Sequence, residues 1–217
     1  MSAKIEAVIF DMDGLIIDSE PLWRIAEISA FKEIGFDFTD EMCASTMGMR
    51  IDQVVAHWWE KLKWDSPSQN QLVNTIINKM IIQINKFGKP MPGLEYIINL
   101  LMRNDVSMAI ASSSSFLLIE TVVRKLQIKH HFDVIHSAEN EVNGKPHPAV
   151  FLTAAKLLGK KPENCLVLED SKAGMEAGLN AKMRTIVIPE KDSNPEWSKK
   201  AFKKIDSLND FKIDFLI

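Results

Sequence analysis

Short, continuous apolar runs recur along this chain, and helix-like patterns separate most of them. The runs are rich in β-branched residues and occupy positions 7–10, 106–111, 132–135, 165–168 and 185–188. Such runs are typical of parallel strands that are covered on both faces. Apolar residues with three- and four-residue spacing fall between them, at 93–102, 116–126, 149–158 and 173–179. This alternation predicts an α/β fold with a parallel, Rossmann-like sheet and right-handed crossovers.

One interval interrupts the alternation. Between the first two apolar runs the sequence shows only helical patterns, at 22–34, 51–62 and 66–87, with Pro67 tolerated in the first turn of the last one. We therefore expect an α/β core of residues 1–18 and 90–217, with an all-helical cap domain of residues 19–89 inserted after the first strand. The prolines and glycines of 88–93 are suited to a hinge.

Composition and charge exclude several classes of protein. A hydrophobic content of 46% in 217 residues is ample for a buried core, and the net charge of −3 comes without a basic stripe that would bind nucleic acid. No apolar run approaches the ~20 residues that span a bilayer. The N-terminus runs into a strand rather than a signal peptide. We expect a cytoplasmic monomer with no nucleic-acid or membrane partner, and buried thiols at Cys43 and Cys165.

Polar side chains follow three of the predicted strands. Asp11 and Asp13 come after the first, Ser112 opens a serine run after the second, and Glu169 and Asp170 follow the run at 165–168. Active sites of open α/β sheets lie beyond the carboxyl ends of the strands. The sequence therefore predicts that these acids and this hydroxyl meet at one edge of the sheet.

Four converging carboxylates require a cation. They would repel one another, and some would take up protons, unless a divalent ion neutralised them. A set of oxygen ligands without histidine or cysteine favours Mg²⁺ over zinc. Mg²⁺ completes its coordination with water and phosphate oxygens, so a small phosphomonoester fits as substrate. We expect Lys145, in the loop before a helix, to donate to the phosphate together with Ser112 and Ser113.

Two aspartates separated by one residue can divide the work of hydrolysis. Asp11 is suited to act as the nucleophile that forms an aspartyl phosphate. Asp13 would protonate the departing alkoxide and then activate water. An Asp-x-Asp sequence alone is often only a turn, so the prediction depends on the whole set occurring in order at the expected strand ends.

Together these residues resemble the four motifs of the haloacid-dehalogenase superfamily over essentially the whole chain. The matching positions are Asp11 to Leu15 with Asp18 and Ser19, then Ser112, then Lys145, and finally Glu169 to Ser171. An insertion directly after the first motif resembles the helical cap of the phosphoglucomutase-like subgroup. The resemblance implies Mg²⁺ ligation by Asp11, Asp170 and the backbone carbonyl of Asp13, with Glu169 supporting through water.

The stretches at 18–23 and 47–55 resemble the sugar-phosphate phosphatases of this superfamily. That resemblance implies hydrolysis of hexose 6-phosphates, 2-deoxyglucose 6-phosphate and hexitol phosphates. It also places Trp23 and the turn at 48–52 near the entrance of the site. Arg50 follows Gly48 near a predicted helix start, and the cap offers few other fixed charges, so we expect Arg50 to hold substrate when the cap is closed.

Other activities of the superfamily remain as alternatives. β-Phosphoglucomutases normally carry a histidine where this chain has Trp23, and an indole cannot exchange protons with Asp13. Phosphonatases use a cap lysine as a Schiff base, whereas lysines on helices such as those expected here are ordinarily solvated. Dehalogenases lack the second aspartate of the first motif, which this chain has at Asp13. A phosphate-binding regulator without activity would lack a nucleophile or a metal ligand, and none is missing here.

Overall fold

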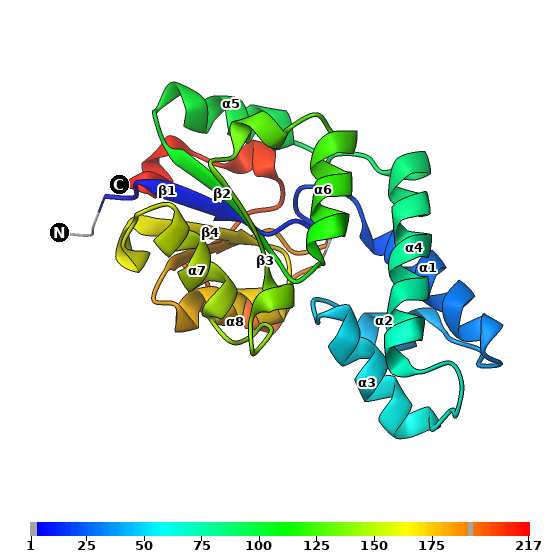
Figure 1. Cartoon of the computed structure of the whole chain (residues 1–217). Coiled ribbons are helices and arrows are strands. Elements are labelled where there is room, and N and C mark those ends of the chain that lie inside the picture. The colour runs from blue at the N-terminus through cyan, green and yellow to red at the C-terminus, as the bar shows by residue number, and fades with distance from the viewer. Residues whose placement is uncertain (1–3, 191–192) are drawn as a thin grey trace.

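A computed structural model describes residues 4–190 and 193–217 of the chain. Its strands are all parallel and lie in the order β3-β2-β1-β4-β5-β6 (Figure 1). Their bounds are β1 Ala7–Phe10, β2 Ser107–Ser112, β3 Val134–Ser137, β4 Cys165–Glu169, β5 Arg184–Val187 and β6 Lys203–Lys204. The predicted α/β class and parallel sheet are thus confirmed, and β6 is an edge strand that the sequence did not reveal.

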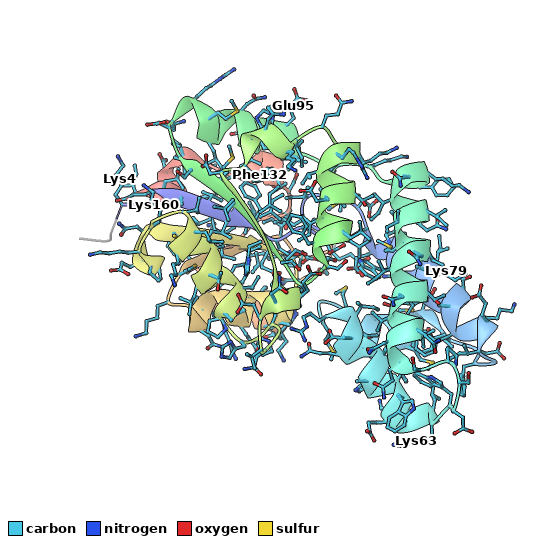
Figure 2. All side chains as sticks on the ribbon, viewed as in Figure 1. Lys4, Lys63, Lys79, Glu95, Phe132 and Lys160 are labelled. Carbon is cyan, nitrogen blue, oxygen red and sulfur yellow. The ribbon has the colours of Figure 1, made fainter. Side chains whose placement is uncertain are left out.

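Helices cover both faces of the sheet. These helices are α5 Leu94–Arg103, α6 Phe116–Lys125, α7 Ala149–Leu157 and α8 Lys172–Asn180. Residues of β1 alternate between the two faces, with Val8 and Phe10 packing with α5 and α6, while Ala7 and Ile9 pack with α7 and α8. Figure 2 shows the side chains that fill the space between the sheet and its helices, with Phe132 among them. This two-sided burial explains why the strands are apolar throughout.

The interval between β1 and β2 is helical, as predicted. It contains α1 Glu20–Glu33, α2 Asp40–Ser45, α3 Ile51–Leu62 and α4 Gln69–Phe87, which we call the helical block. Helix α4 packs against α1 and α3 within the block and against α6 of the sheet layers. None of the described helices is long and apolar enough to cross a bilayer. The division into a core and a mobile cap domain at residues 18 and 90 remains a prediction.

Two details of the helical block differ from the expectation. Helix α4 begins at Gln69 rather than at residue 66, because Ser68 is the N-cap and forms a capping box with Gln71. Pro67 therefore precedes the helix. Helix α2 was not expected, and Thr39 caps its first turn by accepting a hydrogen bond from the Met42 amide.

The chain enters and leaves the helical block at adjacent points. The amide of Asp18 donates to the carbonyl of Lys89 at 3.0 Å, and the amide of Met91 donates to the carbonyl of Ile16 at 2.9 Å. Ile17 and Pro90 form an antiparallel bridge between these contacts. The two connecting segments are thus tied to each other beside the end of β1.

Candidate active site

A pocket lies between the carboxyl edge of the sheet and the helical block. Its cavity has a volume of about 60 Å³. Seven of the predicted site residues line it: Asp11, Asp13, Trp23, Ser112, Ser113, Lys145 and Asp170. Ser112 ends β2, and the loops after β1, β2 and β4 supply the others except Trp23, which comes from α1, and Lys145, which comes from the loop before α7. The strand order places β1 between β2 and β4, so these loops meet at the centre of the sheet.

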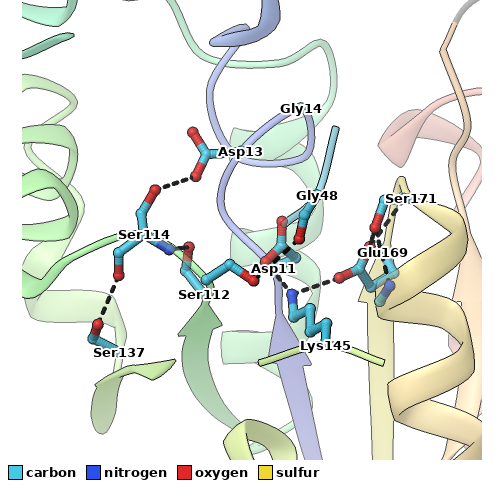
Figure 3. A network of polar contacts seen from close by, with 12 residues as sticks. Asp11, Asp13, Gly14, Gly48, Ser112, Ser114, Ser137, Lys145, Glu169 and Ser171 are labelled. Carbon is cyan, nitrogen blue, oxygen red and sulfur yellow. Dashed lines mark hydrogen bonds and ion pairs between the residues drawn. The ribbon is translucent and has the colours of Figure 1, made fainter. Parts of the chain in front are cut away.

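Lys145 joins two of the acids. Its Nζ atom lies 2.5 Å from Asp11 Oδ1 and 2.6 Å from Glu169 Oε1, and its side chain is only 2% exposed (Figure 3). Burial opposes the charge of the ammonium group, but the carboxylates of Asp11 and Glu169 more than offset this and raise the pKa of Lys145. Lys145 is therefore a fixed cation beside the Asp11 carboxylate.

Glu169 is fully buried and positions its neighbours. Its Oε1 accepts from Lys145, and its Oε2 accepts from both the amide and the hydroxyl of Ser171 at 2.9 Å. Gly174 leaves room for this carboxylate, because a Cβ atom there would lie 1.6 Å from Glu169 Oε1. The Gly174 amide donates to Ser171 Oγ at 3.1 Å, which closes the first turn of α8 around Glu169.

The acids can hold a metal ion. Asp11, Glu169 and Asp170 each offer a carboxylate oxygen, and these oxygens lie within 4.8 Å of one another. Burial raises the pKa of Asp11 to about 8, although Lys145 opposes the rise. Burial and the charges of Glu169, Asp11 and Glu20 also raise the pKa of Asp170 well above its usual range. These carboxyl groups therefore ionise readily only when a positive charge lies beside them. A hard divalent cation such as Mg²⁺, which prefers oxygen ligands, supplies that charge.

Gly14 shapes the same site. It adopts a φ of +70°, and a Cβ atom at this position would lie 2.1 Å from Asp170 Oδ2. Only glycine can bring the loop after β1 this close to the acid that follows β4. The close approach brings Asp11 and Asp170 together although they lie far apart in the sequence.

The carboxylate of Asp13 is held by three donors. Its Oδ1 accepts from Ser19 Oγ at 2.7 Å and from Trp23 Nε1 at 2.8 Å. Its Oδ2 accepts from Ser114 Oγ at 2.7 Å, as Figure 3 shows. Trp23 belongs to the helical block and Ser114 to the loop after β2, so the orientation of Asp13 depends on both sides of the pocket.

The serine run forms an ordered turn. Ser112 Oγ accepts from the amide of Ser114 at 3.0 Å, and Ser137 Oγ donates to the carbonyl of Ser114 at 2.7 Å (Figure 3). Ser113 Oγ donates to the carbonyl of Gly48 in the helical block at 3.3 Å. Ser112 is buried at the bottom of the pocket, where its hydroxyl can meet an anion.

Arg50 does not line the pocket. Its Nη1 donates to the carbonyls of Ala138 and Glu141 at 2.9 and 2.7 Å, and its Nε and Nη2 donate to the Asp52 carboxylate. The guanidinium group therefore joins the helical block to the loop after β3. Four of its five N–H donors are engaged in these contacts, and the expectation that Arg50 holds substrate when the cap is closed stays a prediction.

Comparison with known proteins agrees with this geometry. A family model described as haloacid dehalogenase-like hydrolase matches residues 8–188, which span the sheet from β1 to β5, the helical block and all the predicted site residues. The chain belongs to the haloacid dehalogenase-like hydrolases.

Two relatives and one solved structure are similar to this hydrolase over most of its length. It is 38% identical over 188 residues to hexitol phosphatase B of Escherichia coli (strain K12), covering 86% of this chain and 84% of that protein. It is 29% identical over 181 residues to a phosphorylated carbohydrates phosphatase of Thermotoga maritima, covering 83% of each. The crystal structure of β-phosphoglucomutase from Clostridium difficile superimposes with a TM-score of 0.84 at 29% identity, covering 98% of this chain and 95% of that one.

Sequence reasoning overlooked several residues of this hydrolase that take part in the site. Ser19 and Ser114 hold Asp13, and Ser171 holds Glu169. Ser19 stands within the first motif and Ser114 within the serine run, so the sequence pointed to both positions but not to their contact with Asp13. Glu27 also lines the pocket, and its only signal was an acid among the apolar positions of α1.

Proposed function

We propose that this hydrolase is a magnesium-dependent phosphatase of small sugar and sugar-alcohol phosphates that works through an aspartyl-phosphate intermediate. The observation that supports this best is the position of Lys145, whose ammonium group bridges Asp11 and Glu169 within the pocket that also holds Asp13. A nucleophilic carboxylate, a fixed cation and a second carboxyl for proton transfer are the groups that such a reaction needs.

The first half-reaction uses Asp11 and Asp13. A carboxylate oxygen of Asp11 attacks the phosphorus atom and forms the acyl phosphate, while the bond between phosphorus and the ester oxygen breaks. Asp13, in its protonated form, gives its proton to the departing alkoxide. Ser19, Trp23 and Ser114 hold the Asp13 carboxyl in place, so its orientation is fixed before the substrate reacts.

The second half-reaction returns the enzyme to its starting state. Asp13 accepts a proton from a water molecule, whose oxygen attacks the phosphorus atom of the acyl phosphate. The bond between phosphorus and the Asp11 oxygen breaks, which releases inorganic phosphate and regenerates the carboxylate. Lys145, Ser112 and Ser113 would stabilise the charge on the phosphoryl oxygens in both steps.

The metal would be held by Asp11 and Asp170, with Glu169 and the backbone carbonyl of Asp13 completing the protein's contribution. When bound, Mg²⁺ would neutralise charge on the carboxylates and on the transferring phosphoryl group. Glu169 already accepts three hydrogen bonds from Lys145 and Ser171. Glu169 would therefore support the metal site mainly by holding Lys145 and Ser171 in position.

The substrate class is supported by the relatives and by the size of the pocket. Hexitol phosphatase B and the Thermotoga maritima phosphatase both carry carbohydrates or polyols in their names. The cavity between the sheet edge and the helical block is small. We propose that the helical block acts as a cap that opens to admit a compact phosphomonoester and closes over it.

A phosphate-release assay across a panel of phosphomonoesters, with and without Mg²⁺, tests the proposal. We expect hexose 6-phosphates, 2-deoxyglucose 6-phosphate and hexitol phosphates to give the highest kcat/KM. A preference for nucleotides would contradict the substrate class, and no phosphate release from any compound would favour a regulatory role without catalysis.

The likeness to β-phosphoglucomutase raises a second candidate function, the transfer of a phosphoryl group within a hexose. Mutase activity requires a group in the first cap helix that exchanges protons with Asp13, and Trp23 occupies that position here. Its indole N–H donates to Asp13 Oδ1 but cannot accept a proton in return. Because this isomerisation releases no inorganic phosphate, formation of glucose 6-phosphate from β-glucose 1-phosphate, measured with glucose-6-phosphate dehydrogenase as coupling enzyme, would identify a mutase.

A further inference from the structure

One face of α1 forms a wall of the pocket opposite the catalytic loops. Glu20, Trp23, Arg24 and Glu27 all line the cavity, at the three- and four-residue spacing that places side chains on the same face of a helix. Trp23 reaches the reacting groups, since it donates to Asp13. Glu27 follows one turn later, about 6 Å further along the axis at 1.5 Å per residue.

Glu27 is a buried acid without a full set of partners. It is 6% exposed, and among the residues that the structure describes its Oε2 atom has no hydrogen-bond partner. The neighbouring polar group is the thiol of Cys43, which is a weak donor. A buried, unsatisfied oxygen costs roughly 1–3 kcal/mol of stability. Within the described parts of the fold, no group satisfies the Oε2 atom of this carboxyl.

The surroundings of Glu27 are suited to a hydroxyl group rather than to a cation. The grouped acids capable of holding a metal among the described residues are Asp11, Glu169 and Asp170, and Glu27 is not part of that set. Burial raises the pKa of Glu27 to about 7, so near neutral pH the carboxyl exists in both protonation states. A hydroxyl both donates and accepts, and so can pair with either state.

We propose that Glu27 binds hydroxyl groups on the non-phosphate part of the substrate, and so selects extended polyol and sugar phosphates over shorter or apolar esters. This inference rests on the proposed function, because it places the reacting phosphate beside Asp11. The carboxyl lies a helical turn beyond the contact between Trp23 and Asp13, so only an ester with several carbon atoms beyond the phosphate reaches it.

Three substrates and three variants test this role. The substrates are sorbitol 6-phosphate, glycerol 3-phosphate and p-nitrophenyl phosphate. The variants are Glu27→Gln, Glu27→Leu and, as a matched control on the same helix, Glu33→Gln. Glu33 lies outside the pocket lining and forms an ion pair with Lys79.

We expect Glu27→Leu to lower kcat/KM for sorbitol 6-phosphate about 10- to 100-fold, as the loss of a hydrogen bond to a polar site implies. The values for glycerol 3-phosphate and p-nitrophenyl phosphate should stay within about threefold of wild type. Glu27→Gln should give a smaller loss on sorbitol 6-phosphate, because an amide also donates and accepts. Glu33→Gln should behave as wild type on all three substrates.

Thermal unfolding separates binding from folding. Leucine removes an unsatisfied polar group, so Glu27→Leu should unfold at or above the wild-type temperature. Equal losses on the three substrates, or an unchanged kcat/KM for sorbitol 6-phosphate, would overturn the inference. Poor hydrolysis of all sugar and polyol phosphates by the wild type would instead defeat the proposed function, and the wild-type panel alone shows this.

Discussion

Replacing Gly174 with alanine should damage both stability and activity, although alanine is the better helix former. Gly174 lies in the first turn of α8, where alanine would favour the helix by about 1 kcal/mol. The new Cβ atom would lie 1.6 Å from Glu169 Oε1 and 2.3 Å from Oε2. Because the new Cβ atom would overlap the Glu169 carboxylate, and because Glu169 is fully buried, the carboxylate would have to leave its present position.

The cost follows from the contacts that Glu169 would lose. Displacing it breaks a buried ion pair with Lys145 and two hydrogen bonds from Ser171. Breaking a buried pair costs roughly 3–5 kcal/mol, so after the gain in helix propensity the net loss is about 2–4 kcal/mol. At about 2–4 °C per kcal/mol for a chain of this size, Tm should fall by roughly 4–16 °C. Lys145 would also lose its orientation, and a displacement of about 1 Å can cost about 10²-fold in kcat.

Gly144→Ala provides the matched control. A Cβ atom there would lie 2.8 Å from Gln53 Oε1, which is the far end of a flexible side chain that can move aside. We expect it to unfold within about 3 °C of wild type. Thermal unfolding in the absence of metal and phosphate release in its presence measure the two effects. A Gly174→Ala variant that unfolds at or above the wild-type temperature and keeps kcat within twofold would refute this role of Glu169.

Three further predictions concern the reacting groups, the metal and the contact between the block and the sheet layers. Asp11→Asn should lower kcat by at least ~10³-fold, since the nucleophile is lost; a variant with a tenth of wild-type turnover would contradict the mechanism. Chelation with EDTA should abolish phosphate release, with Mg²⁺ restoring it and Ca²⁺ restoring it poorly, whereas full activity after exhaustive chelation would exclude the metal site. Arg50→Ala should reduce kcat/KM for a hexose 6-phosphate and for p-nitrophenyl phosphate alike, because Arg50 joins the helical block to Ala138 and Glu141; a loss confined to the sugar phosphate would show that it binds substrate instead.

The sequence was sufficient for most of the fold because the strands and the longer helices carry strong local patterns. Residues 165–168, for example, are continuously apolar, and the strand that forms is β4 Cys165–Glu169. Elements without such a pattern were missed. Strand β6 consists of Lys203–Lys204 and depends on pairing with β5, while α2 is only six residues long. The start of α4 was misplaced because a proline is compatible with a first helical turn, whereas the capping box of Ser68 and Gln71 sets the start at Gln69.

The acids of the site were predictable for a different reason. Parallel strands end at a common edge, so the positions of the strand ends along the sequence are enough to place Asp11 near Asp170. No comparable rule predicts which residues of the helical block contact the rest of the chain. The bond from Trp23 to Asp13 and the bond from Arg50 to Ala138 depend on how the block packs, which no local pattern encodes.

The two segments that connect the sheet to the helical block lie side by side, and this bears on how such a protein can diverge in evolution. Asp18 and Lys89 are joined by a 3.0 Å hydrogen bond, so the chain leaves the sheet and returns to it at nearly the same place. An insertion with its ends already together adds little strain to the scaffold, and long surface insertions cost little closure entropy. We therefore expect the segment between these residues to be exchangeable as a unit, provided that the replacement keeps the donor to Asp13 that Trp23 supplies. Recombination at this junction could give the same phosphoryl-transfer machinery a new set of substrates without altering a single strand.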